Sequence, residues 1–273
     1  MIVAGIDAGA KNVHVVLIRD GELVARAAVL SGFDHEESAE RGLAEAAAAA
    51  GIGRGDIDLV AATGAGRKAL SFAPQQPTEI AADARGAFDL YPGARTVIDV
   101  GADEARAIRL RADGKVLDFA INEKCAAGAG AFVEAMSRAV EMDLDDFAKA
   151  SLDSTETIPM NAQCTVFAES EVVSLIHANT PPGDIARAVH DAMASRVSAM
   201  VRRIGIEDPV VLGGGAARNI GFVKSLAEAL GGVDIYVLAD AEYLGAHGAA
   251  LIAWEAAGAG HKHHNLDGRR TCY

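Results

Sequence analysis

A turn of the form Ile-Asp-x-Gly-Ala occurs twice in this 273-residue chain, at residues 6–10 and 98–102. Each copy follows an apolar, strand-like run and precedes a second one, Val13–Ile18 or Ala105–Leu110. An Asp-Gly pair comes next, at Asp20–Gly21 and at Asp113–Gly114. Such a pair between apolar runs predicts a hairpin, because type I′ turns need positive φ angles. The offset is 92 residues at the first aspartate and 93 at the last. The chain therefore contains two copies of a three-strand unit, which predicts two similar α/β domains and not a solenoid.

The segments between and after the copies predict the other elements. An Ala-rich segment ended by Gly51 favours helix, and Pro74 and Pro77 mark a loop before the next helix. The expected helices are Glu36–Ala50, Glu79–Leu90, two that start near Ala129 and Phe167, Asp184–Ile204, one that ends at Leu230, and one from about Tyr243. The further expected strands are Ile57–Ala62, Val210–Leu212 and Val233–Val237.

Composition excludes several classes of protein. Apolar residues make up 51% of the chain and charged residues 23%, which is ordinary for a globular protein and excludes disorder and collagen. The formal charge of −13 argues against nucleic acid and anionic membranes as partners. The first residues lack the pattern of a signal peptide, and no apolar run reaches 18 residues, so we expect a cytoplasmic location.

The glycine turns suit a nucleotide. Glycine lets the backbone approach phosphate oxygens, and an aspartate can hold Mg²⁺ or its waters. A third turn, Gly213-Gly214-Gly215, follows a strand and precedes a helix, whose N-terminus suits an anion. Each turn alone is a weak signal, since none is a Walker A sequence or a Gly-x-Gly-x-x-Gly fingerprint. Together they predict nucleotide binding.

This combination resembles the actin-like ATPase superfamily of sugar kinases, Hsp70 and actin. The resemblance implies an α/β, ribonuclease H-like fold duplicated into two domains with a nucleotide cleft between them. It places phosphate loops at Asp7–Lys11 and Asp99–Glu104 and the adenosine motif at Gly213–Ala216. The first domain would span residues 1–92, completed by a helix at about 243–257. The second would span 93–242, and residues 258–273 would form a disordered tail.

Two of the three cysteines precede predicted helices. Cys125 lies in Lys-Cys-Ala-Ala-Gly-Ala-Gly and Cys164 in Cys-Thr-Val-Phe-Ala-Glu-Ser-Glu. The positive end of a helix dipole favours the thiolate, which is the form that binds iron. A four-iron cluster takes four thiolates, so two chains would supply a full set. The alternative is that both are small buried hydrophobes, as free cysteines commonly are.

These two motifs and the segment 194–197, Ala-Ser-Arg-Val, resemble the BadF/BadG/BcrA/BcrD ATPase family over nearly the whole chain to about residue 255. That family contains the activators of 2-hydroxyacyl-CoA dehydratases and the ATPase subunits of benzoyl-CoA reductases. The resemblance implies one [4Fe-4S] cluster shared between two subunits, with Cys125 and Cys164 as the ligands from this chain.

One departure and one likeness favour one branch of the family. The activators tend to carry Gly-Gly-Gln-Asp in the second loop, where this chain has Gly101-Ala102-Asp103-Glu104. Together with Asn122-Glu123-Lys124 before the cysteine, this acidic loop looks more like the smaller ATPase subunit of benzoyl-CoA reductase. Our main hypothesis from the sequence is that role. An activator of a 2-hydroxyacyl-CoA dehydratase is the alternative.

The expected chemistry is ATP hydrolysis coupled to electron transfer. Reduced ferredoxin would fill the shared cluster, and electrons would pass to acyl-CoA-reducing subunits. We expect Asp7, Asp99 and Asp103 to position Mg²⁺ and water, with Asp99 or Glu104 orienting the attacking water. The residues expected to approach the nucleotide are Gly9, Ala10, Lys11, Gly101, Ala102, Gly128, Gly130, Gly213, Gly214, Gly215 and Ala216.

Several alternatives stay open. A sugar kinase of the same fold would use Asp99 as a general base and treat both cysteines as packing residues. A passive subunit would only complete the cluster and the interface. The partner is a related ATPase subunit or a second copy of this chain.

Overall fold

The computed structural model describes residues 1–122, 129–160 and 165–258. The described chain divides into two compact units. Unit 1 contains residues 1–94, 110–117 and 238–258, and unit 2 contains 95–109 and the described part of 118–237. Each unit is built on one copy of the repeated strands.

Unit 1 contains a four-stranded sheet in the order β3-β2-β1-β4. Its strands are β1 (Ile2–Ala8), β2 (Asn12–Arg19), β3 (Glu22–Leu30) and β4 (Leu59–Thr63). β2 pairs antiparallel with both β1 and β3, whereas β4 runs parallel to β1. The parallel pair brings Asp7 and Thr63 to the same register at one edge of the sheet.

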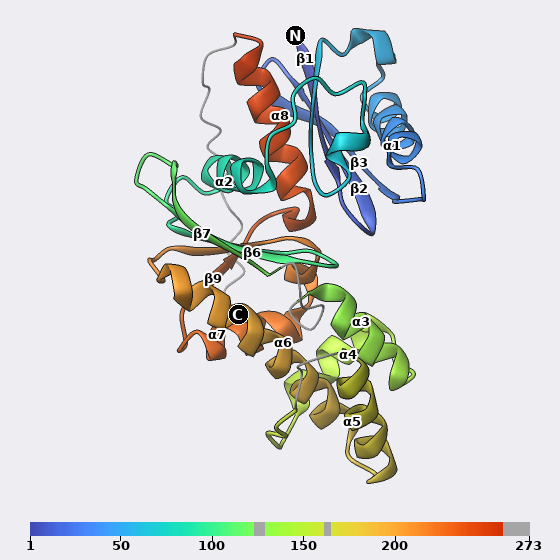
Figure 1. Ribbon diagram of the computed structural model, residues 1–273, viewed down its shortest axis with the longest axis vertical. Helices are drawn as coiled ribbons and strands as arrows, with labels where there is room; N and C mark the ends of the chain where they lie inside the picture. The colour runs from blue at the N-terminus through green and yellow to red at the C-terminus, as the bar shows by residue number, and fades with distance from the viewer. Residues whose placement is uncertain (123–128, 161–164, 259–273) are drawn as a thin grey trace. The chain divides into compact units, whose positions relative to one another are not determined.

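Helices cover both faces of this sheet (Figure 1). α1 (His35–Ala49) packs on one face, where Val15, Leu17 and Leu43 belong to one apolar cluster. α8 (Leu244–Ala256) packs on the other, where Val3, Val16 and Trp254 belong to a second cluster. Since the sheet is buried from both sides, its central strands are almost continuously apolar.

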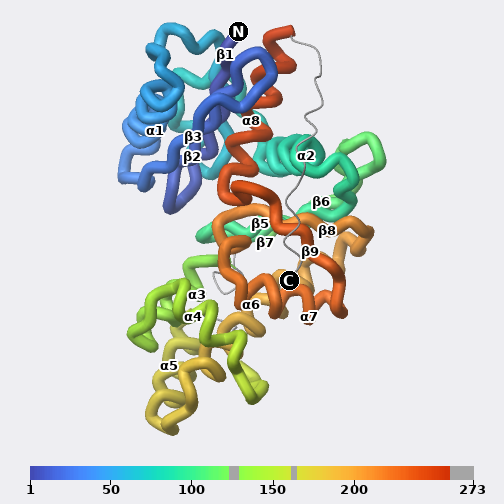
Figure 2. Tube along the Cα trace, turned by 180° about the vertical axis from the view of Figure 1, so that it is seen from behind, coloured from blue at the N-terminus to red at the C-terminus, as the bar shows by residue number. Residues whose placement is uncertain are grey.

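Glycines allow α8 to lie very close to its neighbours. A Cβ added at Gly5 of β1 would lie 2.0 Å from the Ala246 carbonyl oxygen, and one at Gly248 would lie 1.8 Å from that of Ala82. Ala82 belongs to α2 (Glu79–Leu90), which lies beside α8 in both views (Figure 1 and Figure 2). Such backbone-to-backbone packing fixes α8 against β1 and α2, because no side chain at these positions can push them apart.

Unit 2 contains a five-stranded sheet in the order β7-β6-β5-β8-β9. Its strands are β5 (Thr96–Val100), β6 (Ala105–Leu110), β7 (Val116–Asn122), β8 (Val210–Gly213) and β9 (Ile235–Val237). β5 pairs antiparallel with β6 and parallel with β8, as β1 does with β2 and β4. The sheets of the two units thus confirm the repeat predicted from the sequence.

The helices of unit 2 lie mostly between β7 and β8 in sequence. They are α3 (Gly130–Ala139), α4 (Leu144–Ala150), α5 (Thr165–His177) and α6 (Pro182–Ile204), with α7 (Ile220–Ala229) after β8. Of these, α4 was not predicted. This helix has only seven residues, too few to show a 3.6-residue period, and burial of Phe147 and Ala148 fixes it in place.

The two Asp-Gly turns differ. Asp20 and Gly21 both have positive φ, at 54° and 88°, as a type I′ turn requires, so that prediction is confirmed. At the second turn only Gly114 has positive φ, and its N–H donates to the Arg111 carbonyl. The predicted hairpin is confirmed there as well, since β6 and β7 are neighbours in the sheet and the Arg111 N–H donates to the Lys115 carbonyl at 2.8 Å. Its turn is not type I′, because the one extra residue in this copy lengthens the loop and produces a wider turn.

A second correction concerns the triple glycine. We expected a helix to start directly after it, but a short 3₁₀ turn, Gly215–Arg218, comes first and α7 starts at Ile220. The Asn219 side chain caps α7 by accepting from the Phe222 N–H at 2.9 Å. Among the described residues, no helix is long and apolar enough to cross a membrane.

Candidate functional site

Asp7, at the end of β1, lies against two glycines that are distant in sequence. A Cβ at Gly64 would lie 2.4 Å from Asp7 Oδ1, and one at Gly245 would lie 2.8 Å from Asp7 Oδ2. Gly64 follows β4 and Gly245 is in the first turn of α8. The carboxylate therefore occupies a space that these two glycines keep open.

The first glycine turn is hydrogen-bonded to Ser31, the residue directly after β3. The Gly9 N–H donates to the Asn12 carbonyl at 3.1 Å, which closes the turn between β1 and β2. The Ser31 hydroxyl donates to the Gly9 carbonyl at 2.7 Å, and the Ser31 N–H donates to the Lys11 carbonyl at 2.9 Å. These two bonds hold the turn in place. Ala10 and Lys11 are exposed at the tip. The turn thus presents its backbone and Lys11 on a fixed frame.

Asp99 and Glu104 of the second turn share one cation, Arg106. Arg106 Nη1 lies 2.6 Å from Asp99 Oδ2, and Nη2 contacts Glu104 Oε1. Asp99 and Arg106 are only 6% and 8% exposed. They face each other because residues 99 and 106 are direct partners in the antiparallel pairing of β5 and β6. The two candidate catalytic carboxylates are therefore held by one buried guanidinium.

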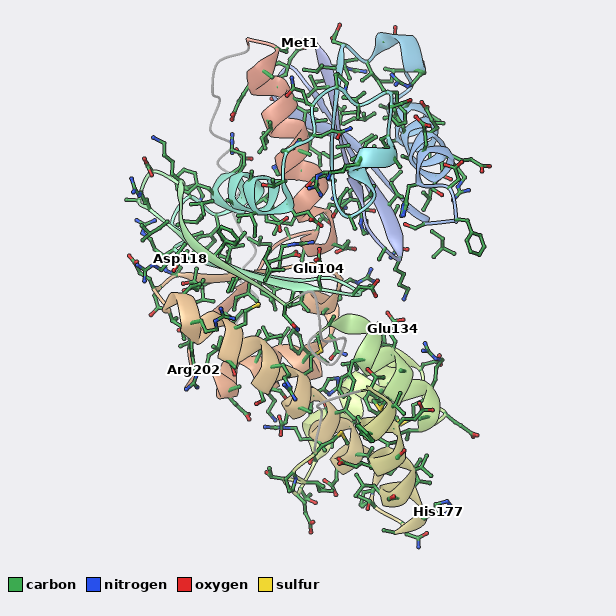
Figure 3. All side chains as sticks on the ribbon, in the orientation of Figure 1. Met1, Glu104, Asp118, Glu134, His177 and Arg202 are labelled. Carbon is green, nitrogen blue, oxygen red and sulfur yellow. The ribbon has the colours of Figure 1, made fainter. Side chains whose placement is uncertain are left out.

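The rest of the second turn is closed by backbone bonds. The Gly101 N–H donates to the Glu104 carbonyl at 2.9 Å, and Asp103 is exposed (Figure 3 labels Glu104). The first N–H groups of α3, from Gly130 and Ala131, donate to the carbonyls of Gly101 and Ala102, each at 2.9 Å. The Gly130 N–H thus binds the turn, and the approach of Gly130 to a nucleotide stays a prediction. The hydrogen bond from Gly130 helps to hold that turn in place.

The third turn lies beside the second. Gly213 is the register partner of Asp99 in the parallel pairing of β5 and β8. Gly214 has a φ of 82°, and a Cβ there would lie 2.3 Å from the Val100 carbonyl oxygen. Gly215 is exposed, with nothing within 4 Å of an added Cβ. One glycine is thus required by packing, while no residue that the structure describes comes close to the next, which leaves room for a ligand.

The repeat extends beyond what the sequence indicated. Gly64 in unit 1 corresponds to Gly214 in unit 2, because both follow the parallel strand beside the aspartate and both have positive φ. A Cβ at either would strike the carbonyl of the residue after the aspartate, Ala8 at 2.6 Å and Val100 at 2.3 Å. The two sequence patterns did not reveal this match because the flanking residues, Thr63 and Gly213, differ.

Three residues near the turns were missed by the sequence analysis. In the sequence Arg106 is an ordinary charged residue in a predicted strand, and Asp83 is an ordinary charged residue in an Ala-rich helix. Asp83 is buried on α2, and its Oδ1 lies 3.4 Å from an added Cβ at Gly245, next to Asp7. The buried Thr63 hydroxyl lacks a hydrogen-bond partner within the described chain. The position of Thr63, directly before Gly64 at the end of a predicted strand, was the sequence feature that could have indicated it.

Each unit by itself carries groups that suit a magnesium-bound nucleotide. Carboxylates such as Asp7 are the hard oxygen ligands that Mg²⁺ takes, directly or through water. Thr63 supplies an orphaned buried hydroxyl at the register position of Asp7. Exposed glycine backbone at Gly215 suits close approach of a ligand.

The cysteine prediction falls on residues that the structure does not describe. Cys125 lies in 123–128, Cys164 in 161–164 and Cys272 in 259–273, and Gly128 is in the first of these gaps. Within the described ranges no group of three or more His, Cys, Asp or Glu side chains could hold a metal. The helix that follows Cys164 is described: α5 exposes large apolar side chains, among them Val166 at 67% and Phe167 at 65%.

A comparison with protein families decides what these turns belong to. Residues 4–253 match the model of the BadF/BadG/BcrA/BcrD ATPase family. The chain belongs to this family of ATPases. It is 40% identical over 257 residues to the activator of lactoyl-CoA dehydratase from Anaerotignum propionicum, covering 94% of this chain and 99% of that protein. It is 34% identical to a benzoyl-CoA reductase subunit from Thauera aromatica, covering 92% of each.

Solved structures agree with the family assignment. The (R)-2-hydroxyglutaryl-CoA dehydratase component A of Acidaminococcus fermentans superposes with a TM-score of 0.90 at 36% identity, covering 94% of this chain and 99% of that one. A glucokinase of the ROK family from Streptomyces griseus reaches a TM-score of 0.54 at 15% identity, covering 93% and 100%. The second likeness shows the fold alone. This chain therefore has the actin-like ATPase fold, as predicted from the sequence.

Proposed function

We propose that this chain is an ATP-hydrolysing activator of a 2-hydroxyacyl-CoA dehydratase. The observation that carries the proposal is similarity along almost the whole chain to the activator of lactoyl-CoA dehydratase, at 40% identity. The activator of 2-hydroxyisocaproyl-CoA dehydratase from Clostridioides difficile is 36% identical over 257 residues. This favours the alternative over our main hypothesis from the sequence, a benzoyl-CoA reductase subunit.

ATP would bind at the three glycine turns. A related activator, 36% identical and superposing with a TM-score of 0.90, has been solved with bound ADPNP. Asp7 would hold Mg²⁺ or its waters, and the backbone near Gly101 and Gly215 would face the nucleotide. Asp99, held by Arg106 at 2.6 Å, would orient the attacking water. Asp103, Lys11 and Ala216 keep their expected roles at the turns.

The proposal includes a [4Fe-4S] cluster, because the chain has two cysteines that suit its ligands. Cys125 and Cys164 would supply two thiolates, and a partner chain the other two. The cluster would carry low-potential electrons from a donor such as reduced ferredoxin. The exposed Val166 and Phe167, directly after Cys164, support a protein interface at this place, because large apolar side chains are usually covered.

A second candidate is the ATPase subunit of a benzoyl-CoA reductase. The observation that favours it is the acidic second turn, Asp103-Glu104, together with the similarity to the Thauera aromatica subunit. In that role the chain would pair with a related subunit and pass electrons to acyl-CoA-reducing subunits.

Reconstitution distinguishes the two roles. The chain is purified without oxygen and given MgATP and reduced ferredoxin. It is then added to lactoyl-CoA dehydratase freed of its own activator, or to benzoyl-CoA reductase lacking its matching ATPase subunit. We expect lactoyl-CoA dehydration to start only when this chain and ATP are both present. Restored reduction of benzoyl-CoA without any dehydration would overturn the proposal.

A variant tests whether the chain itself hydrolyses ATP. Asp99→Ala in this chain should lower ATP turnover of the assembled complex by roughly a hundredfold, the usual lower bound for loss of a group that handles protons or water. Unchanged turnover would mean that the chain is a passive subunit.

A further inference from the structure

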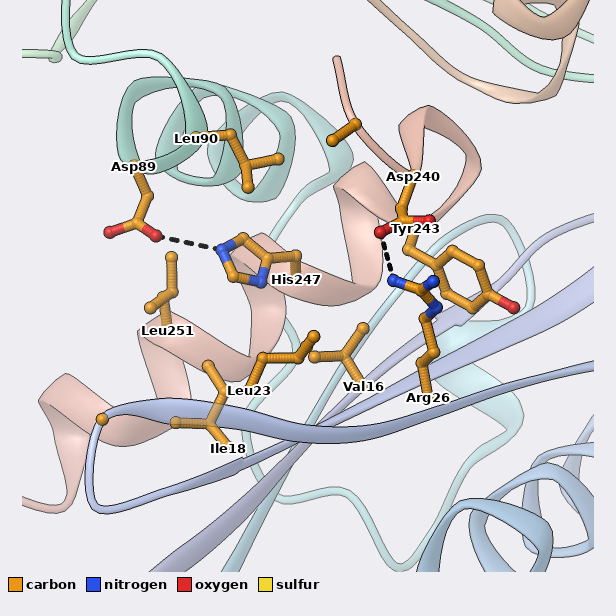
Figure 4. Close-up of a pocket in the computed structure, with 12 residues that line it drawn as sticks. Val16, Ile18, Leu23, Arg26, Asp89, Leu90, Asp240, Tyr243, His247 and Leu251 are labelled. Carbon is orange, nitrogen blue, oxygen red and sulfur yellow. Dashed lines mark hydrogen bonds and ion pairs between the residues drawn. The ribbon is translucent and has the colours of Figure 1, made fainter. Parts of the chain in front are cut away.

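Unit 1 contains a pocket outside the glycine turns (Figure 4). The empty space in and above it is about 660 Å³, which includes space open to solvent, so the pocket is a groove that a ligand can enter from the surface. Its walls come from β2, β3, α2, α8 and the segment before α8, all within unit 1. Most of the lining is apolar, with Val16, Ile18 and Leu23 on the sheet and Leu90 and Leu251 on the helices.

The pocket exists because α8 is too narrow to cover the whole sheet face. α8 packs on β1, β2 and β4, and this leaves the outer strand β3 without a helix on that side. Leu23 of β3 is consequently 45% exposed. An apolar ligand that covered this side chain would remove its surface from water, which favours binding.

One cation, Arg26, lines this space, and within the described part of the chain most of its N–H donors have no hydrogen-bond partner. The Arg26 guanidinium makes one hydrogen bond, from Nη1 to Asp240, and lies over the Tyr243 ring at 5.4 Å from its centroid. Its side chain is 41% exposed. A guanidinium has five N–H donors in a planar fork that fits a carboxylate, so a second carboxylate can bind beside Asp240.

The other charged group of the pocket is already neutralised. Asp89 Oδ2 lies 3.0 Å from His247 Nε2, and Oδ1 lies 3.3 Å from Arg85 Nη1. Burial raises the pKa of Asp89, but the hydrogen bonds and charges of His247 and Arg85 outweigh it and lower the pKa below its usual value. Asp89 and Asp240, the two carboxylates that line the pocket, thus each have a partner. Arg26 is the lining group that can still bind a charged ligand.

We propose that this pocket binds a small aliphatic carboxylate, with its carboxylate on Arg26 and its chain along Val16, Ile18, Leu23 and Leu251. The site is distinct from the nucleotide turns. Tyr243, directly before α8, and His247, in its first turn, both line the pocket. A Cβ at Gly245 would instead lie 2.8 Å from Asp7 Oδ2, which does not line it.

Binding of octanoate to the purified full chain, measured by calorimetry, tests the proposal. Octan-1-ol and octylamine, which have the same chain with no charge or a positive one, are the matched ligands. We expect one octanoate per chain and at least tenfold weaker binding of the other two. Arg26→Gln should weaken octanoate binding at least tenfold. Arg41→Gln, a change on α1 at the other face of the sheet, should leave it unchanged.

Four results would overturn it: no saturable binding of octanoate, equal binding by the Arg26→Gln variant, equal binding of octan-1-ol, or preferential binding of octylamine. Because Arg26 is an exposed residue of an outer strand, the variant is expected to fold, and its circular dichroism checks this. Nucleotide binding is not part of the readout, so the result is independent of the proposed ATPase role.

Discussion

Arg106 Nη1 lies 2.6 Å from Asp99 Oδ2, and a second nitrogen of the same guanidinium contacts Glu104. The pair is buried in the strand pairing of β5 and β6 and links the start of the second glycine turn to its end. A planar guanidinium can serve two carboxylates at once, whereas an ammonium is a single point charge. Arg106 therefore helps to set the geometry of both candidate catalytic carboxylates.

Removing this guanidinium should lower both stability and activity. In Arg106→Gln the buried Asp99 loses its cation, and loss of one partner of such a pair costs about 3 kcal/mol of unfolding free energy. Arg106→Lys should recover part of the stability but less of the ATP turnover. Urea unfolding and ATP hydrolysis measure these effects, with Arg111→Gln as an exposed control in the same hairpin. Normal ATP turnover in Arg106→Gln would contradict the positioning role.

A pair of glycine variants tests the space around Asp7. Gly51 and Gly64 both have positive φ, so alanine at either costs about 1 kcal/mol of backbone strain. At Gly64 the Cβ would also strike Asp7 and Ala8, whereas at Gly51 none of the described residues lies within 4 Å of it. Affinity for ADPNP should fall at least tenfold in Gly64→Ala and stay unchanged in Gly51→Ala. Equal affinities would place Asp7 away from the nucleotide.

Iron content tests the cysteine prediction. Anaerobically purified protein should be brown and hold about four irons per pair of chains, as one [4Fe-4S] cluster requires. Cys125→Ser and Cys164→Ser should each lose most of this iron, while Cys272→Ser, the control, should keep it. Full iron in either of the first two variants would show that the ligand assignment is wrong.

A buried histidine makes stability depend on pH. Burial, and then the charge of Arg187, lower the pKa of His190 to about 3, against 6.5 in the unfolded chain. The unfolded state therefore binds the extra proton first, and the contribution is present in full above pH 6.5 and is lost as pH falls toward 3. Between about pH 7.5 and about pH 5.0 the loss from this group is about 2 kcal/mol.

Denaturant unfolding of His190→Leu at these two pH values checks this sign. The variant should lose about 2 kcal/mol less than the parent chain over this change of pH. His177→Leu, at the exposed end of α5 (Figure 3), should behave as the parent does. If His190→Leu lost as much unfolding free energy between these pH values as the parent chain does, the histidine would take up its proton in the folded state.

Local patterns were enough to find the repeat, the strand ends with Asp7 and Asp99, and the positions of most helices. α2 is observed at Glu79–Leu90, as predicted, because the Thr78 cap and the Ala-rich run that follows act within a few residues of each other. The cysteine motifs likewise indicate the family, because each is a short run of consecutive residues that needs no partner from elsewhere in the chain.

The relationships among distant residues were decided by tertiary structure. Gly245 comes to the Asp7 carboxylate only because α8 returns to β1, and Asp89 meets His247 only because α2 packs on α8. Arg106 reaches Asp99 through strand register, and the wide turn at Gly114 followed from one inserted residue. Periodicity and turn residues report on neighbours along the chain. Which side chains meet across it depends on how sheets and helices pack, and a single sequence carries no local mark of that.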